Sequence, residues 1–125
     1  MIKPTSRLII IDNSGGRRVV CIKLVNKPPK SYASVGDIIL VIVKTYRKAI
    51  KKRLVNKKQI YHGLIVGTKK NVNRVSGISL NLLYNSMVVL SKDYNLIAKR
   101  IRGTVFVELR HKNFTKIATI AENVI

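Results

Sequence analysis

The side chains that could carry out acid–base or metal chemistry are few and scattered. General acid–base catalysis needs a pKa-tuned pair of groups, and a zinc site needs three or four ligands at a recognised spacing. Cys21, His62 and His111 do not provide that spacing, and Gly15-Gly16 fits a turn better than a phosphate-binding loop. We therefore expect no enzyme, no metal and no cofactor. The five carboxylates are Asp12, Asp37, Asp93, Glu108 and Glu122.

Basic side chains are the chemistry that the sequence does offer. The chain has 25 Lys and Arg against 5 Asp and Glu, a formal net charge of +20 over 125 residues. From Ile38 to Lys92 it contains no carboxylate. A small domain with such a field repels itself unless a polyanion neutralises it, and phosphate contacts dominate the affinity of protein–nucleic acid complexes. The composition therefore predicts a nucleic acid partner.

Several candidate contacts lie beside turns or strand ends. They are Arg17 and Arg18, Lys69 and Lys70 followed by Arg74, and Arg100 and Arg102. Arginine presents a rigid fork suited to phosphate, and lysine a mobile point charge. Tyr32, Tyr46 and Tyr61 lie near basic residues and could stack on unpaired bases, or they could be core aromatics. Because no pattern indicates a code for base sequence, we expect a folded nucleic acid recognised by shape and backbone.

Five short apolar segments, separated by turn residues, must position these side chains. They are rich in β-branched residues, which favours strands, and apolar on both faces, which favours a closed sheet. We expect a mainly β fold, a small five-stranded β-barrel. Cys21 lies in one of these segments and is expected in the core. The segments span residues 8–11, 17–25, 38–43, 61–66 and 86–90.

Two further features accompany the barrel. Residues 44–58 contain eight basic residues and no acidic one, so we predict a projecting basic β-ribbon there, with a solvated charged face as the alternative. Near the C-terminus, apolar residues from Val105 to Ala118 recur every three or four positions and predict two short helices. Asn113 is the expected N-cap of the second helix, and Glu108 suits a first helical turn. We expect one domain over 1–125, with the barrel over about 1–98 and the helical segment over about 99–125.

Membrane and targeting signals are weak. The longest apolar run, residues 38–43, is far shorter than the roughly 20 residues of a transmembrane helix. Residues 1–4 resemble neither a secretory nor a mitochondrial presequence, so we expect a protein made where it acts, or a mature form. The frequent Ile, Lys, Asn and Tyr have codons rich in A and T, which indicates an organelle genome.

The order and spacing of several segments resemble the universal large-subunit ribosomal protein L-fourteen family over nearly the whole chain. Departures include Gly16 where Ala is usual and Thr104 where Pro is usual. The segments are DNSG (12–15), SVGDII (34–39), GLIV (63–66), TKK (68–70), RIRG (100–103), ELR (108–110) and NFTKI (113–117).

This resemblance implies a structural constituent of the large ribosomal subunit that binds its rRNA, supports assembly and contributes to bridges between subunits. Implied partners are proteins of the L-three and L-nineteen families, small-subunit rRNA at a bridge and a ribosome-silencing factor, and no membrane. The implied rRNA contacts are Arg17, Arg18, Lys44, Lys69, Lys70, Arg74, Arg100 and Arg102, joined by Lys51, Lys52 and Arg53 on charge alone.

We expect the protein on the mitochondrial ribosome, with a plastid or the bacterial cytoplasm as alternatives. Two other functions remain open. A single-strand-binding barrel would need several exposed aromatics on one sheet face, and the chain has seven Tyr and Phe in all. A cationic nuclease would need clustered carboxylates for metal ions, which the long acid-free stretch argues against.

Overall fold

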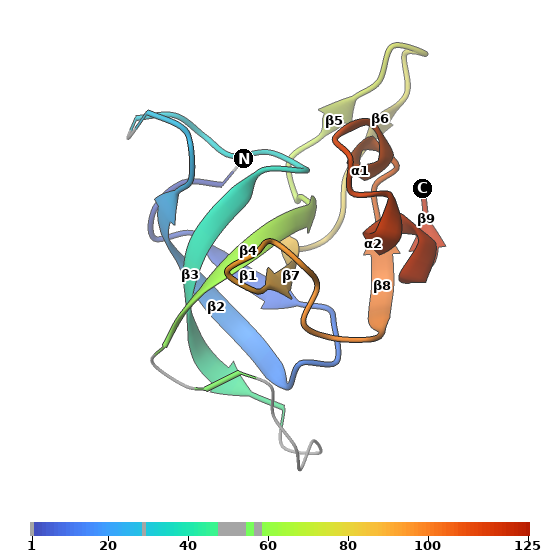
Figure 1. Cartoon of the computed structure of the whole chain (residues 1–125). Coiled ribbons are helices and arrows are strands. Elements are labelled where there is room, and N and C mark those ends of the chain that lie inside the picture. The colour runs from blue at the N-terminus through green and yellow to red at the C-terminus, as the bar shows by residue number, and fades with distance from the viewer. Residues whose placement is uncertain (1, 29, 48–54, 57–58) are drawn as a thin grey trace.

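Five strands close into a barrel that forms the body of the molecule (Figure 1). The computed structural model describes residues 2–28, 30–47, 55–56 and 59–125. Neighbouring strands are antiparallel, except that the first and last barrel strands pair in parallel and close the barrel. This confirms the predicted five-stranded barrel. In barrel order the strands are β1 (Arg7–Ile10), β2 (Gly16–Leu24), β3 (Ile38–Tyr46), β4 (Ile60–Gly67) and β7 (Ser86–Leu90).

Alternation along the strands divides the apolar residues between two cores. Inside the barrel, side chains such as Val19, Val41 and Val89 are fully buried. The outward-facing Leu64 of β4 and Val88 of β7 are buried too, because the C-terminal segment packs over them. β7 is therefore buried along its whole length, which explains the unbroken apolar run from Met87 to Leu90.

The segment over β4 and β7 contains β8 (Ile101–Val105), α1 (Glu108–His111), α2 (Thr115–Ile120) and β9 (Ala121–Val124). These elements gather on one side of the barrel in Figure 1. The two short helices confirm the prediction, and Glu108 lies in the first turn of α1 as expected. The parallel pair β8–β9 was not predicted, and Val105 belongs to this pair.

The predicted N-cap of the second helix was wrong. The N-cap of α2 is Phe114, without a side-chain cap. Asn113 instead has a φ of 68°, a left-handed conformation that asparagine tolerates better than most residues. It makes the turn that redirects the chain between the two helices.

A second hairpin, formed by β5 (Val72–Asn73) and β6 (Ser79–Leu80), projects beyond the barrel at the top of Figure 1. The ribbon predicted for residues 44–58 lies mostly outside the described residues. β3 extends to Tyr46, and Val55 is buried in the barrel core. Val55 packs close to Gly16, because a Cβ atom added to Gly16 would lie 3.3 Å from a methyl group of Val55.

Cys21 is buried in the core as expected, and burial raises the pKa of its thiol to about 11. Among the described residues, neither helix is long and apolar enough to cross a bilayer.

Candidate nucleic-acid interface

A β-bulge at the start of β2 exposes two consecutive arginines. Regular alternation would turn one of two neighbouring side chains inward, but the pairing of β2 with β3 shifts register on both sides of Arg18. An extra residue in one strand breaks the alternation, and both Arg17 and Arg18 are exposed. Arg18 pairs with Ile9 of β1 and Thr45 of β3, so its side chain lies in the middle of the sheet.

Two grooves meet at Arg18. One, of about 270 Å³, is lined by Arg7, Arg18 and Lys44 together with β2 and β3. The other, of about 380 Å³, is lined by Arg7, Arg18 and Lys69 together with β1 and the loop before β7. Arg7 and Arg18 line both grooves, and Lys44 and Lys69 each line one of them. We call these four residues the basic track. It crosses the barrel from β3 to the end of β4.

Asn85 fixes the Lys69 end of the track. Its side-chain oxygen accepts a hydrogen bond from the Lys69 backbone N–H at 2.9 Å, and its carbonyl accepts one from Ile9 at 2.9 Å. The residue therefore connects the end of β4 to β1. Gly67 allows the loop to pack closely here, because a Cβ at this position would lie 2.3 Å from Leu82.

Arg100 and Arg102 are held elsewhere, against the turn at residues 12–15. The Asn13 amide donates to the Arg100 carbonyl at 3.1 Å, and the Arg102 amide donates to the Ile11 carbonyl at 2.7 Å. Both arginine side chains are exposed. The turn and the start of β8 thus present a second basic region, separate from the lining of the two grooves.

Asp12 anchors that turn from inside. It is fully buried, and its oxygens accept hydrogen bonds from the amides of Ser14 at 3.0 Å and Val89 at 2.9 Å. Burial raises the pKa of the carboxyl group, although these hydrogen bonds and the charge of Arg47 act in the opposite direction. Its hydrogen bonds serve the fold, because they connect the turn to β7.

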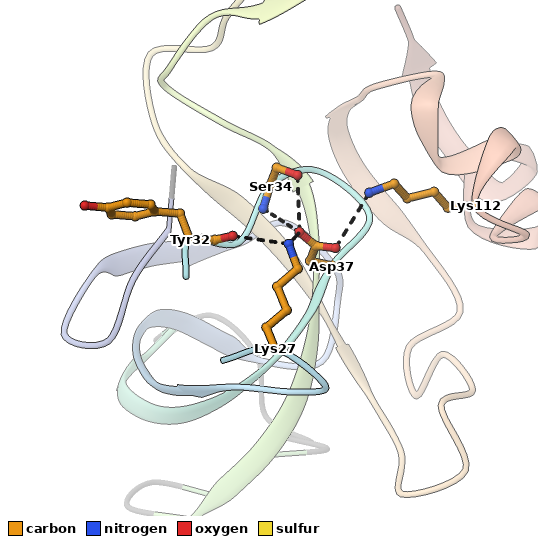
Figure 2. A network of polar contacts seen from close by, with 5 residues as sticks. All are labelled: Lys27, Tyr32, Ser34, Asp37 and Lys112. Atoms are coloured by element: carbon orange, nitrogen blue, oxygen red, sulfur yellow. Dashed lines mark hydrogen bonds and ion pairs between the residues drawn. The ribbon is translucent and has the colours of Figure 1, made fainter. Parts of the chain in front are cut away.

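Asp37 forms a second internal anchor, shown in Figure 2. It accepts hydrogen bonds from Lys27 at 2.8 Å and from the Ser34 amide at 2.7 Å, and Lys112 lies 3.6 Å from its other oxygen. Partial burial alone would raise the pKa of Asp37, but the Lys27 and Ser34 hydrogen bonds and the Lys112 charge hold it below its ordinary value. The network connects the loop before β3 to the residue that follows α1.

Arg74 is also engaged internally. Its Nε donates to Glu108 at 2.7 Å, and its Nη2 donates to Glu108 and to the Ile125 carbonyl. Partial burial alone would raise the pKa of Glu108, but the hydrogen bond from Arg74 holds this pKa below its ordinary value. The same hydrogen bond raises the pKa of Arg74. The guanidinium ties the β5–β6 hairpin to α1. An RNA contact by Arg74 stays a prediction.

The other predicted contacts have their charges available. In the described part of the chain the ion pairs use Lys27, Arg74 and Lys112. The remaining predicted cations that the structure describes are exposed and have no ion-pair partner among the described residues. They are Arg17, Arg18, Lys44, Lys69, Lys70, Arg100 and Arg102. Lys51, Lys52 and Arg53 lie outside the described residues.

The structure brings together Arg18, Lys44 and Lys69 but not the whole predicted set. Lys70 lines a different hollow, together with Ser34 and Thr68. Arg7 is a member of the track that sequence reasoning missed, since it is a single basic residue at the start of a strand. Its one sequence signal is the alternation with the buried Leu8 and Ile10, which turns Arg7 outward.

Two of the three tyrosines weighed for base stacking pack on the barrel core. These are Tyr46 and Tyr61, whereas Tyr32 is exposed. The rings of His62 and Tyr94 pack at right angles, with ring centroids 5.2 Å apart. The described residues include no cluster of three or more His, Cys, Asp or Glu side chains that could hold a metal ion.

A closed barrel that carries exposed, unpaired cations over several strands belongs to a class typical of nucleic-acid-binding proteins. The model of the family Ribosomal protein L14p/L23e matches residues 1–125, and the chain belongs to that family. The family is structural and non-enzymatic, and its members are proteins of the large ribosomal subunit. Membership confirms the resemblance noted from the sequence and implies a place in the ribosome among rRNA and other ribosomal proteins.

Proposed function

We propose that this chain is a structural constituent of the large ribosomal subunit that binds large-subunit rRNA through the basic track and the Arg100–Arg102 region. The observation that carries the proposal is the distribution of charge. The described ion pairs lie around Asp37 and Glu108, and no carboxylate is among the described residues that line the two grooves of the track. The strands fix the backbone positions of these cations, so several phosphates can be bound at once with little ordering of the backbone.

Arg17, Lys70 and Arg74 complete the proposed set of described contacts, and Lys51, Lys52 and Arg53 extend it on charge alone. In this role the chain is not an enzyme. It supports subunit assembly and takes part in bridges to small-subunit rRNA, with proteins of the L-three and L-nineteen families as neighbours and a ribosome-silencing factor as a transient partner.

We further propose a mitochondrial ribosome as the location, in preference to a plastid or bacterial one. The support is compositional, because the chain is rich in Ile, Lys, Asn and Tyr, whose codons favour A and T. Locating the gene and reading the genetic code of the genome that carries it tests this assignment. A gene in a bacterial chromosome would overturn it.

A salt titration tests the RNA-binding proposal. The purified protein is bound to a large-subunit rRNA fragment on filters at increasing salt. Because each phosphate contact releases counterions, about six to ten contacts should lower the affinity by roughly three to five decades between 50 and 200 mM salt. An affinity that does not change with salt would contradict the proposal.

Matched variants locate the effect on the track. Arg18→Ala should reduce the slope of log affinity against log salt by about one unit. Lys92→Ala removes an equal charge from the loop after β7, away from both grooves of the track, and should leave the slope nearly unchanged. Equal effects of the two variants would show that net charge, and not the track, governs binding.

A further inference from the structure

The groove at the Lys69 end of the track has an apolar wall that phosphate binding does not require. Leu83 and Tyr84, in the loop before β7, line it together with the basic residues. Leu83 is 90% exposed and Tyr84 is 41% exposed. A large apolar side chain and an aromatic ring beside concentrated charge are typical of sites that bind both a base and its phosphates.

The same groove also has a cationic wall. Arg7, Arg18 and Lys69 line the groove, and no carboxylate is among its described lining residues. Guanidinium groups form strong charge-assisted hydrogen bonds with phosphate oxygens. The groove therefore combines a surface for base stacking with groups that bind phosphate. Its volume is about 380 Å³, which is in the size range of pockets for small organic ligands.

We propose that this groove binds one unpaired nucleotide of an RNA, with its base stacked on Tyr84 and its flanking phosphates held by Arg7, Arg18 and Lys69. The site rests on the proposed rRNA-binding function and adds the kind of RNA element that it takes. A regular duplex would present phosphates but keep its bases stacked inside the helix, so it would leave Leu83 and Tyr84 uncovered. An extruded or single-stranded nucleotide covers both walls.

Hydrogen bonds fix the two walls relative to each other before any ligand arrives. Asn85 directly follows Tyr84, and it accepts the Lys69 amide through its side chain and the Ile9 amide through its carbonyl. The aromatic wall, the lysine and β1 are thus joined through one residue. Such preorganisation lowers the entropy lost on binding. Because every base has an aromatic face, the site should tolerate any base.

The test compares two strands that differ in their bases alone. One is a strand of about ten uridines, which is within the length that a single barrel binds, and the other has the same backbone without bases. Binding is followed by fluorescence anisotropy at one low salt concentration. The wild-type protein should bind the uridine strand about tenfold more tightly than the abasic one, because stacking adds to phosphate contact.

Variants test whether Tyr84 causes the preference for the uridine strand over the abasic one. Tyr84→Ala should reduce the ratio to about one, whereas Tyr84→Phe should keep it because the ring remains. Arg7→Ala should weaken both strands equally, since it removes a phosphate contact. The matched control is Tyr94→Ala, which removes a ring of similar exposure, 43%, at the other end of β7, and should keep the wild-type ratio.

Two results would overturn the inference: a wild-type protein that binds both strands equally, or a Tyr84→Ala variant that keeps the wild-type ratio. The first needs no variant, so a folding defect cannot obscure it. Failure of the nucleotide site is distinguishable from failure of the proposed function. Steep salt dependence on the rRNA fragment with no preference between strands rejects the nucleotide site alone, and absence of rRNA binding rejects the function itself.

Discussion

Three carboxylates in this protein stabilise the fold and do not pair with the cations of the basic track. Asp12, Asp37 and Glu108 are buried or partly buried and hold loops to the barrel or to α1. A carboxylate facing the track would neutralise an arginine or lysine and repel phosphate. Their placement away from the two grooves of the track therefore avoids repulsion of phosphate there.

The Asp37 network should make stability depend on pH. Because the pKa of Asp37 is lowered in the folded protein, its charged form stabilises the fold above the ordinary pKa near 3.8, and this contribution is lost as the pH falls through the folded value. Asp37→Asn should therefore lower the free energy of unfolding by about 1 kcal/mol at neutral pH. The difference from wild type should shrink below about pH 4.

Urea unfolding of both proteins at several pH values measures this difference. Asp93→Asn is the control, because Asp93 is exposed and its replacement should leave the free energy of unfolding unchanged at each pH. A difference between wild type and Asp37→Asn that persists undiminished at about pH 3 would show that hydrogen-bond shape, and not charge, stabilises the loop.

Among the elements, the C-terminal segment completes a core outside the barrel. Phe106, between β8 and α1, is fully buried and donates its backbone N–H to the Val66 carbonyl at 3.0 Å. It packs with Leu64, Val88 and Leu109. The outer faces of β4 and β7 would be exposed apolar sheet without this cover.

Phe106→Ala should destabilise the protein by about 3–5 kcal/mol, through lost burial and the cavity left behind. Urea denaturation followed by circular dichroism measures the loss. Val75→Ala serves as the control, because Val75 is fully exposed at the tip of the β5–β6 hairpin and should change stability by less than about 0.5 kcal/mol. A loss below about 1 kcal/mol for Phe106→Ala would mean that the segment does not depend on this side chain.

The barrel strands were predictable because each is a run of β-branched residues with turn residues at its ends. β8 and β9 were not, because each is short and the two pair across the intervening helices, as in Thr104 with Asn123. Ile101 and Val105 of β8 lie in the outer core, and Ala121 and Val124 of β9 pack against it, so apolar residues recur every three or four positions and imitate a helical period. For the interface, the turn before Arg17 was a sufficient signal. Arg7 needed the antiparallel register that sets it beside Arg18, and local sequence does not encode that register.

At the scale of the whole molecule, position should matter more than total charge. Lys69→Glu combined with Lys70→Glu reverses two cations at the end of β4, and should block assembly because it introduces repulsion at the track. Large subunits made with this variant should sediment as lighter, incomplete particles in a sucrose gradient. Both side chains are exposed, so the unfolding transition of the purified protein should be close to that of wild type.

The control reverses the same number of charges elsewhere. Lys23→Glu combined with Lys92→Glu alters two exposed lysines that do not line the two grooves of the track, and subunits containing it should sediment normally. Normal sedimentation of the Lys69 and Lys70 variant would argue against the track, and equal defects in both variants would indicate an effect of net charge.

The parallel pairing of β1 with β7, at Ile9 with Ser86 and Ile10 with Met87, couples folding to recognition. Arg7 and Lys69 are brought into one groove only when the last barrel strand docks on the first. A nascent or unfolded chain therefore carries the same charge without the same geometry. Under the proposed function, an RNA that binds only the docked form would act as a folding ligand, and subunit assembly would then take up folded copies of the protein in preference to unfolded ones.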